Sequence, residues 1–183
     1  MHTTRSPLGR TPLPLPDCDR CGFTSSLFPQ GDIADLLRDY ASGWQRVLTG
    51  PGHDRRRVGV PRWSPLEHGC HVRDMCLLFH LRLDAMLGIA PSTSARDAGQ
   101  RYRDEIPTRV AEELGRAAEA LARRLAGLGA DDWNRGDPGL ADPRLTVEFF
   151  TRHLLHDIAH GLAEVRRACD GGGAEQRSRG THG

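Results

Sequence analysis

The stretch of chain over residues 107–129 repeats apolar residues at three- and four-residue steps, and this periodicity constrains the fold more than any other feature. The repeating positions are Val110, Leu114, Ala117, Leu121, Leu125 and Leu128. Residues at this spacing line one face of an α-helix, because the helix completes a turn every 3.6 residues. The pattern therefore predicts an amphipathic helix that buries one face.

Three further segments carry the same periodicity, over residues 32–48, 65–87 and 147–165, and none alternates apolar and polar residues as a strand would. The second begins with Ser64, Pro65 and Glu67, which together predict a capping box. The fourth follows Thr146, a favourable N-cap. Four helices with one apolar face each bury those faces best against one another, so we expect an all-α four-helix bundle.

The composition of the flanking segments predicts where the bundle begins and ends. Residues 1–30 are rich in Pro, Thr and Ser and are expected to form an irregular arm that carries a CxxC motif. The bundle is expected over residues 31–169, and a polar, glycine-containing tail over residues 170–183 is expected to be disordered. The link over residues 89–106 is long enough to cross the end of the bundle, so consecutive helices need not be antiparallel neighbours.

The charge and apolar content of the chain exclude several functional classes. Its 25 basic and 24 acidic residues give a net charge of +1, which offers no general attraction to nucleic acid or to an anionic membrane. Every basic residue is arginine, which excludes chemistry that needs a lysine. No apolar run approaches the roughly 20 residues that span a bilayer, and no secretory signal is evident. We expect a cytoplasmic protein whose five cysteines are reduced.

Three of the nine histidines fall in the fourth predicted helix, in the segment HLLHDIAH. His156 and His160 are four residues apart, so they lie on one helix face and can hold one metal ion from adjacent turns. His153 lies two turns from His160, roughly 10 Å away, which is too far to share that ion. Asp157 follows His156 where an HExxH metalloprotease would have Glu, so that class is excluded.

A third ligand is expected from the second helix, where His71 shares a face with Met75 and Leu78. Glu67 and Asp74 lie one turn to either side of His71 and could orient its imidazole or assist a bound water. Three protein ligands leave coordination positions open, as in catalytic sites. His156 and His160 lie beside the apolar stripe of their helix, which puts the metal at a polar edge of the bundle. The alternative is that all three are ordinary helix histidines.

Cys18 and Cys21 form a CxxC motif followed by Gly22. One such pair supplies half of a zinc site, and Cys70, His53 or a second subunit could supply the rest. Plain reduced thiols are the alternative. Cys70 and Cys76 are expected to be small core residues. The arginines at residues 55–57 are expected to be solvated, or else to hold an anionic cofactor or substrate.

Two segments resemble the DinB-like proteins. WSPLEHGCHVRD, residues 63–74, resembles the W-S-x-x-E-x-x-x-H start of their second helix, and HLLHDIAHGLAEV, residues 153–165, resembles their H-x-x-x-H segment. The closest likeness is to the actinobacterial branch that includes mycothiol-dependent maleylpyruvate isomerase-like proteins. The resemblance implies a DinB-like four-helix bundle, often a homodimer, with a divalent metal on His71, His156 and His160. Zinc is expected first, and nickel or iron also occur in relatives.

The resemblance implies a metal-dependent enzyme. A low-molecular-weight thiol, mycothiol by analogy, would bind the open metal position as a thiolate and add to a small electrophilic substrate, giving S-transfer or isomerisation. Glu67, Asp74 and His153 would support the reaction from beside the ligands. Two alternatives stay open. One is a metal-activated hydrolase with bound water as nucleophile, and the other is a non-enzymatic metal-binding stress or interaction module.

Overall fold

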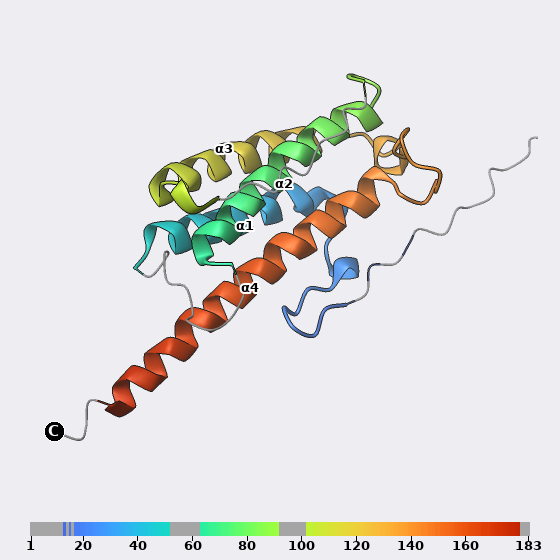
Figure 1. The fold of residues 1–183 in the computed structure, drawn as a ribbon. Coiled ribbons are helices and arrows are strands. Elements are labelled where there is room, and N and C mark those ends of the chain that lie inside the picture. Colours follow the sequence, from blue (N-terminus) through green and yellow to red (C-terminus); the bar gives the residue numbers. More distant parts are fainter. Residues whose placement is uncertain (1–12, 14, 16, 52–62, 92–101, 180–183) are drawn as a thin grey trace, which may run out of the picture.

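A computed structural model describes residues 13, 15, 17–51, 63–91 and 102–179 of the 183-residue chain. Within those residues there are four α-helices and no β-strand: α1 (Ile33–Thr49), α2 (Pro65–Met86), α3 (Pro107–Ala126) and α4 (Val147–Arg179). Four short 3-10 turns are also described. Two precede α1, η1 (Ser25–Leu27) and η2 (Gln30–Asp32); η3 (Tyr102–Asp104) precedes α3, and η4 (Asp132–Asn134) follows it. The predicted all-α bundle is confirmed (Figure 1).

The predicted helix starts of α2 and α4 are confirmed at atomic detail. The Ser64 hydroxyl accepts from the backbone N–H of Glu67 at 3.2 Å, and the Glu67 carboxylate accepts from the backbone N–H of Ser64 at 2.8 Å. These two bonds satisfy N–H groups that have no partner inside the helix. At α4, the hydroxyl of Thr146 accepts from the N–H of Phe149 at 3.3 Å. Both caps fix where a histidine-bearing helix begins, and therefore the register of its histidines.

Helices α1 and α3 form the most extensive pair in the bundle and run antiparallel. Near the start of α1, Arg38 donates to the carboxylate of Glu119 at 2.8 Å. Near its end, Gln45 donates to the backbone carbonyl of Ala111 at 3.2 Å. The residue numbers of the contacts rise along α1 while they fall along α3, as they do only when two helices are antiparallel.

Helices α2 and α3, which are consecutive in the chain, run parallel. Arg73 of α2 contacts Glu113 of α3 at 2.9 Å, and one helix length further on, Asp84 accepts from Arg124 at 3.1 Å. A parallel pair needs a connection that returns along the whole helix. The expectation that consecutive helices need not be antiparallel neighbours is therefore confirmed, and α1 pairs with α3 rather than with α2, its neighbour in the chain.

The core lies between the four helices, where each buries the apolar stripe that predicts it. Trp44 and Ile33 of α1, Leu83 of α2, Leu114 and Leu121 of α3, and Leu155 and Ile158 of α4 are at most 1% exposed. Each large apolar side chain buried in this way contributes about 1.5–3 kcal/mol to folding. Cys70 and Cys76 are fully buried, which confirms them as small core residues.

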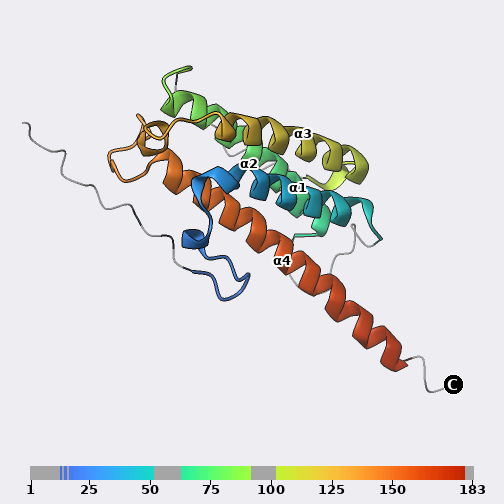
Figure 2. The same cartoon turned by 180° about the vertical axis from the view of Figure 1, so that it is seen from behind.

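The segments before and after the bundle differ in structure: the first is an irregular arm and the second continues the last helix. The described part of the N-terminal arm, from residue 17 on, lies along α4, on the side of that helix away from α3 (Figure 2). At the other end, α4 continues to Arg179 and extends past the ends of the other helices (Figure 1). It thus includes residues 170–179, for which the composition favours disorder, and the disordered tail stays a prediction. In the described part of the chain, no helix combines the length and apolar character needed to cross a membrane.

Candidate metal centre

The two half-sites that the sequence contains, one in the arm and one in α4, meet in the structure. One ligand atom each from Cys18, Cys21, His156 and His160 lies within 4.8 Å of the other three. Within the described residues, this is the one group of three or more His, Cys, Asp or Glu side chains close enough to hold a metal ion. Cys18 Sγ lies 3.4 Å from Nδ1 of His160. Zinc bond lengths to sulfur and nitrogen give about 3.6 Å for this separation in a tetrahedral site.

The arm presents its two thiols from a tight turn. The backbone N–H groups of Cys21 and Gly22 both donate to the carbonyl of Cys18, at 3.3 and 2.7 Å. Gly22 has φ +71°, a left-handed conformation that residues with a Cβ rarely adopt, and the chain then returns to pair Cys18 with Phe23. The turn places both thiols on one side of the arm, facing α4.

Each histidine of the pair directs one ring nitrogen toward the thiols and the other toward a carboxylate. Nδ1 of His156 lies 3.4 Å from Asp157, and Nε2 of His160 lies 3.5 Å from Glu164. Metal-bound imidazoles in proteins commonly contact a carboxylate through the second nitrogen, which fixes the tautomer and the ring orientation. The pair thus offers Nε2 of His156 and Nδ1 of His160 as ligand atoms.

His156 supplies an independent observation that fits a metal at this centre. Its Nε2 is buried and, among the described residues, has no hydrogen-bond partner. A buried polar atom without a partner costs free energy, so such atoms mark a site for an ion or a water. A metal at the centre of the four side chains would satisfy it.

The thiols of the centre differ in acidity from those of the core. The neighbouring imidazole of His156 and the backbone N–H of Cys21 lower the pKa of the Cys18 thiol to about 6, whereas burial raises the pKa of Cys21. Burial raises the pKa of Cys70 and of Cys76 to about 12. Only a thiolate binds a metal, so the acidic Cys18 suits a ligand and the two core cysteines do not.

Several contacts outside the centre hold the arm on α4. The guanidinium of Arg152 donates to the backbone carbonyls of Ser25 and Phe28. Arg20 contacts Glu164 at 2.6 Å, the same carboxylate that faces His160. The ring of Phe23, which is 4% exposed, packs on the imidazole of His156. The arm is therefore positioned by apolar, ionic and hydrogen-bond contacts around the four ligands.

The other expected site residues lie elsewhere. His71 packs against Trp63, with ring centroids 5.0 Å apart, and does not belong to the group of four. Asp74 accepts from Arg73 at 2.8 Å and from the hydroxyl of Tyr102 at 3.0 Å. Glu67 serves the capping box of α2. The structure thus brings together two of the three predicted histidines and adds the two arm cysteines.

His153 remains beside the centre without joining it. Its ring stacks on Phe149 and its Nε2 lies 3.5 Å from Asp157. The side chain is 51% exposed, against 25% for His156. Of the other partners considered for the CxxC, Cys70 is in the core, and His53, like the arginines at 55–57, lies outside the described residues.

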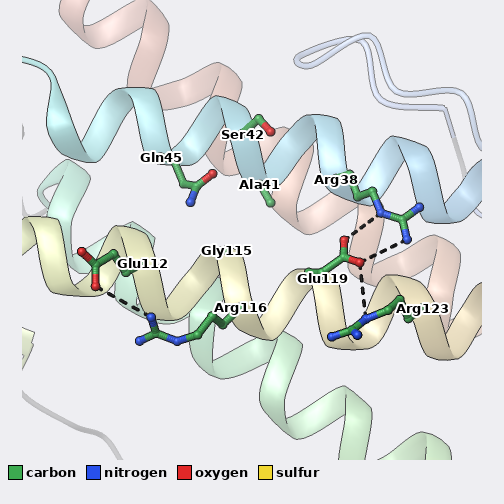
Figure 3. Close-up of a pocket in the computed structure, with 9 residues that line it drawn as sticks. All are labelled: Arg38, Ala41, Ser42, Gln45, Glu112, Gly115, Arg116, Glu119 and Arg123. Atoms are coloured by element: carbon green, nitrogen blue, oxygen red, sulfur yellow. Dashed lines mark hydrogen bonds and ion pairs between the residues drawn. The ribbon is translucent and has the colours of Figure 1, made fainter.

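A groove on another face lies between α1 and α3, with a volume of about 710 Å³ (Figure 3). Its three arginines all face carboxylates. Arg38 and Arg123 contact Glu119 at 2.8 and 3.4 Å, and Arg116 contacts Glu112 at 3.7 Å. Each of these arginines is already paired with a carboxylate of the groove, so the group of four side chains beside α4 is the stronger candidate for chemistry.

Comparison with known families agrees with the helical architecture. A family model described as the DinB superfamily matches residues 35–165, which include all of α2 and α3 and both histidines of the pair. The match begins after the arm, so it does not include Cys18 and Cys21. No curated protein and no solved structure matches the chain.

Proposed function

This chain belongs to the DinB superfamily, and we propose that it is a metal-binding member in which one zinc ion joins the N-terminal arm to α4. Cys18, Cys21, His156 and His160 would be the ligands. The observation that carries the proposal is the convergence of these four side chains within 4.8 Å. Two thiolates and two imidazoles form a common zinc ligand set, and soft thiolates disfavour Mg²⁺ and Ca²⁺.

Four protein ligands favour a structural role for the ion. A tetrahedral zinc with four side chains has no open position, whereas catalytic zinc keeps one for water or substrate. In this role the ion would help to hold the irregular arm on α4, beside the contacts of Phe23 and Arg152. The proposal develops the second of the two alternatives drawn from the sequence, a non-enzymatic metal-binding module.

Thiol transfer or isomerisation remains the alternative that the DinB resemblance suggests. It rests on a site formed by His71, His156 and His160 with one position left for a thiolate. The buried Nε2 of His156 supports either ligand set, because both use this histidine. The geometry favours the cysteine-containing set, since Cys18 lies 3.4 Å from His160 and His71 packs on Trp63. A hydrolase would also need an open metal position, for the attacking water, so the geometry that favours four protein ligands weighs against it in the same way.

The two ligand sets make opposite predictions for single substitutions, which gives a direct test. The full chain is purified without chelator and its metal is measured by elemental analysis. With the proposed set, the wild type and His71→Ala each contain about one zinc per chain, and Cys18→Ser and His156→Ala contain much less. With the three-histidine set, Cys18→Ser keeps its metal and His71→Ala loses it.

His153→Ala is the matched control for His156→Ala. It removes the same side chain from the same helix, three residues away, and His153 is not part of the group of four. We expect its zinc content to equal that of the wild type. Wild-type protein that contains no zinc and takes none up on titration would refute the proposal for both ligand sets.

A further inference from the structure

The two arm cysteines are placed to react with each other as well as to bind a metal. The backbone N–H of Cys21 donates to the carbonyl of Cys18 across a turn. Such a turn brings the first and fourth Cα atoms within about 7 Å, which is the upper limit for a disulfide. The two Sγ atoms are already within 4.8 Å of each other. A small movement of the side chains is enough to bring the sulfurs into bonding distance.

Solvent reaches this pair and does not reach the cysteines of the core. Cys18 and Cys21 are partly exposed, whereas Cys70 and Cys76 are fully buried on α2. The reactivity of a thiol toward oxidants follows its exposure and its thiolate character. Metal-bound cysteines are thiolates by definition, so Cys18 and Cys21 are the described cysteines suited to react with a dissolved oxidant.

We propose that Cys18 and Cys21 form an oxidation site for hydrogen peroxide, at which disulfide formation releases the zinc and with it the hold of the ion on the arm. This inference rests on the proposed function, because it requires zinc at these four ligands. It adds a substrate class, peroxide, and a reversible modification to a site otherwise assigned a structural role.

The reaction balances with peroxide as the only oxidant. One thiolate attacks an oxygen of H₂O₂, the O–O bond breaks, and the sulfur becomes a sulfenic acid while hydroxide leaves. The second thiolate attacks that sulfur, the S–S bond forms, and a second hydroxide leaves. The two hydroxides take up two protons, giving two waters. A disulfide sulfur is a poor zinc ligand, so His156 and His160 alone remain to hold the ion.

Release of the ion leaves the arm with its other contacts only. Arg152 still donates to the carbonyls of Ser25 and Phe28, and Arg20 still contacts Glu164. The Arg20–Glu164 pair is largely exposed on its arginine side and contributes little in water. Phe23, which is 4% exposed and packs on His156, also keeps its contact. We therefore expect the residues of the turn before Phe23 to separate from α4 on oxidation, while Phe23 and residues 25–28 remain attached.

The sequence provides a convenient assay for the disulfide. Arg20 is the one tryptic cleavage site between Cys18 and Cys21, so trypsin divides the region into peptides 11–20 and 21–38. A Cys18–Cys21 disulfide keeps the two peptides joined until a reductant is added. Zinc-loaded full-length protein is treated with hydrogen peroxide, released zinc is measured with a chromogenic chelator, and the digest is analysed by mass spectrometry without reduction.

We expect peroxide to release about one zinc per chain and the two peptides to appear as one joined species. Dithiothreitol followed by zinc should restore both the separate peptides and the bound metal. Cys70 and Cys76 serve as internal controls and should stay available to an alkylating agent only after denaturation. Retention of zinc under peroxide, or release of zinc with the two peptides separate, would overturn the inference and leave the proposed zinc site intact. A starting protein without zinc would contradict the proposed function itself.

Discussion

Cys18 Sγ lies 3.4 Å from Nδ1 of His160, although 142 positions separate the two residues in the chain. The contact joins the arm, in whose described residues there is no α-helix, to the last helix of the bundle. The rest of the arm contacts α4 through Arg152 and through Phe23 on His156. The position of the arm and the geometry of the candidate metal centre therefore depend on each other.

Removal of metal should loosen the arm and lower the thermal stability of the protein. A ligand present at 100 times its dissociation constant stabilises the folded state by about 2.7 kcal/mol, which corresponds to about 5–10 °C in melting temperature for a chain of this size. We expect EDTA to produce a decrease of this order and faster tryptic cleavage after Arg20. Differential scanning calorimetry and timed proteolysis measure the two effects. Equal melting temperatures with and without EDTA in zinc-containing protein would show that the ion does not support the fold.

Arg152→Met should detach the arm without altering any of the four ligands. The guanidinium of Arg152, 16% exposed, donates to the carbonyls of Ser25 and Phe28 and contacts Glu148 at 2.9 Å. Loss of hydrogen bonds from a charged donor that is partly buried costs about 1–3 kcal/mol. Urea denaturation should show a decrease in this range, and zinc should bind more weakly because the arm is less well positioned.

A surface arginine provides the comparison for Arg152. Arg144 contacts Asp142 at 2.8 Å, but its side chain is 51% exposed, and an ion pair of that kind adds little to stability. Arg144→Met should therefore unfold at the urea concentration of the wild type. A similar loss in both variants would mean that the contacts of Arg152 with the arm carry no special weight.

The helices could be predicted from the sequence because each of their determinants is local. The apolar stripe of α3, from Val110 to Leu125, is buried along its length, and the capping box at Ser64 places the start of α2 at Pro65. Such features depend on residues a few positions apart, so a single sequence is sufficient to recognise them. The length of the link before Pro107 permits a parallel α2–α3 pair, but the pairing of α1 with α3 is a tertiary feature that the sequence pattern does not predict.

The candidate centre could be predicted only in halves. The spacing of His156 and His160 defines one pair and the spacing of Cys18 and Cys21 defines the other, and each half is evident in the sequence. What joins them is the tertiary position of the arm, which depends on contacts such as that of Arg152 with Phe28. These contacts span more than 100 residues and leave no periodic pattern. The signal available in the sequence was that each pair is an incomplete ligand set, so that each pair could complete the other.

Gly69→Ala should destabilise the bundle although alanine favours helices. A Cβ at this position of α2 would lie 2.8 Å from both methyl carbons of Leu48, which is fully buried at the end of α1. Alanine gains up to about 1 kcal/mol in helix propensity, but forcing an extra carbon into a packed core costs about 1–3 kcal/mol. We expect a net loss of about 1 kcal/mol in thermal or urea unfolding.

Gly127→Ala, just after α3, is the control for this effect. A Cβ there would approach no atom closer than 3.6 Å, and the backbone has an ordinary negative φ of −88°. Its stability should equal or slightly exceed that of the wild type. If Gly69→Ala were also neutral, the close approach of α1 and α2 at Leu48 would be readily relieved and would not define their packing.

Trp44→Phe should weaken the fold and the metal centre together. Trp44 of α1 is fully buried and its indole N–H donates to the carbonyl of Ile158 at 3.2 Å, midway between His156 and His160. Gly161 of α4 permits this approach, since a Cβ there would lie 3.3 Å from the indole ring. Loss of the hydrogen bond and of ring volume costs about 2–3 kcal/mol.

The effect of Trp44→Phe on zinc separates the two ligand sets when it is compared with Trp63→Phe. Substitution of a residue that contacts a metal ligand directly weakens metal binding by about 10-fold or more. Trp44 bonds the backbone of Ile158, not a ligand side chain, so we expect zinc affinity to decrease by up to about 10-fold. Trp63 is 48% exposed and packs on His71, and neither residue belongs to the group of four. With Cys18, Cys21, His156 and His160 as ligands, Trp63→Phe binds zinc as the wild type does. A competition titration in which Trp63→Phe weakens binding more than Trp44→Phe would instead support His71 as a ligand.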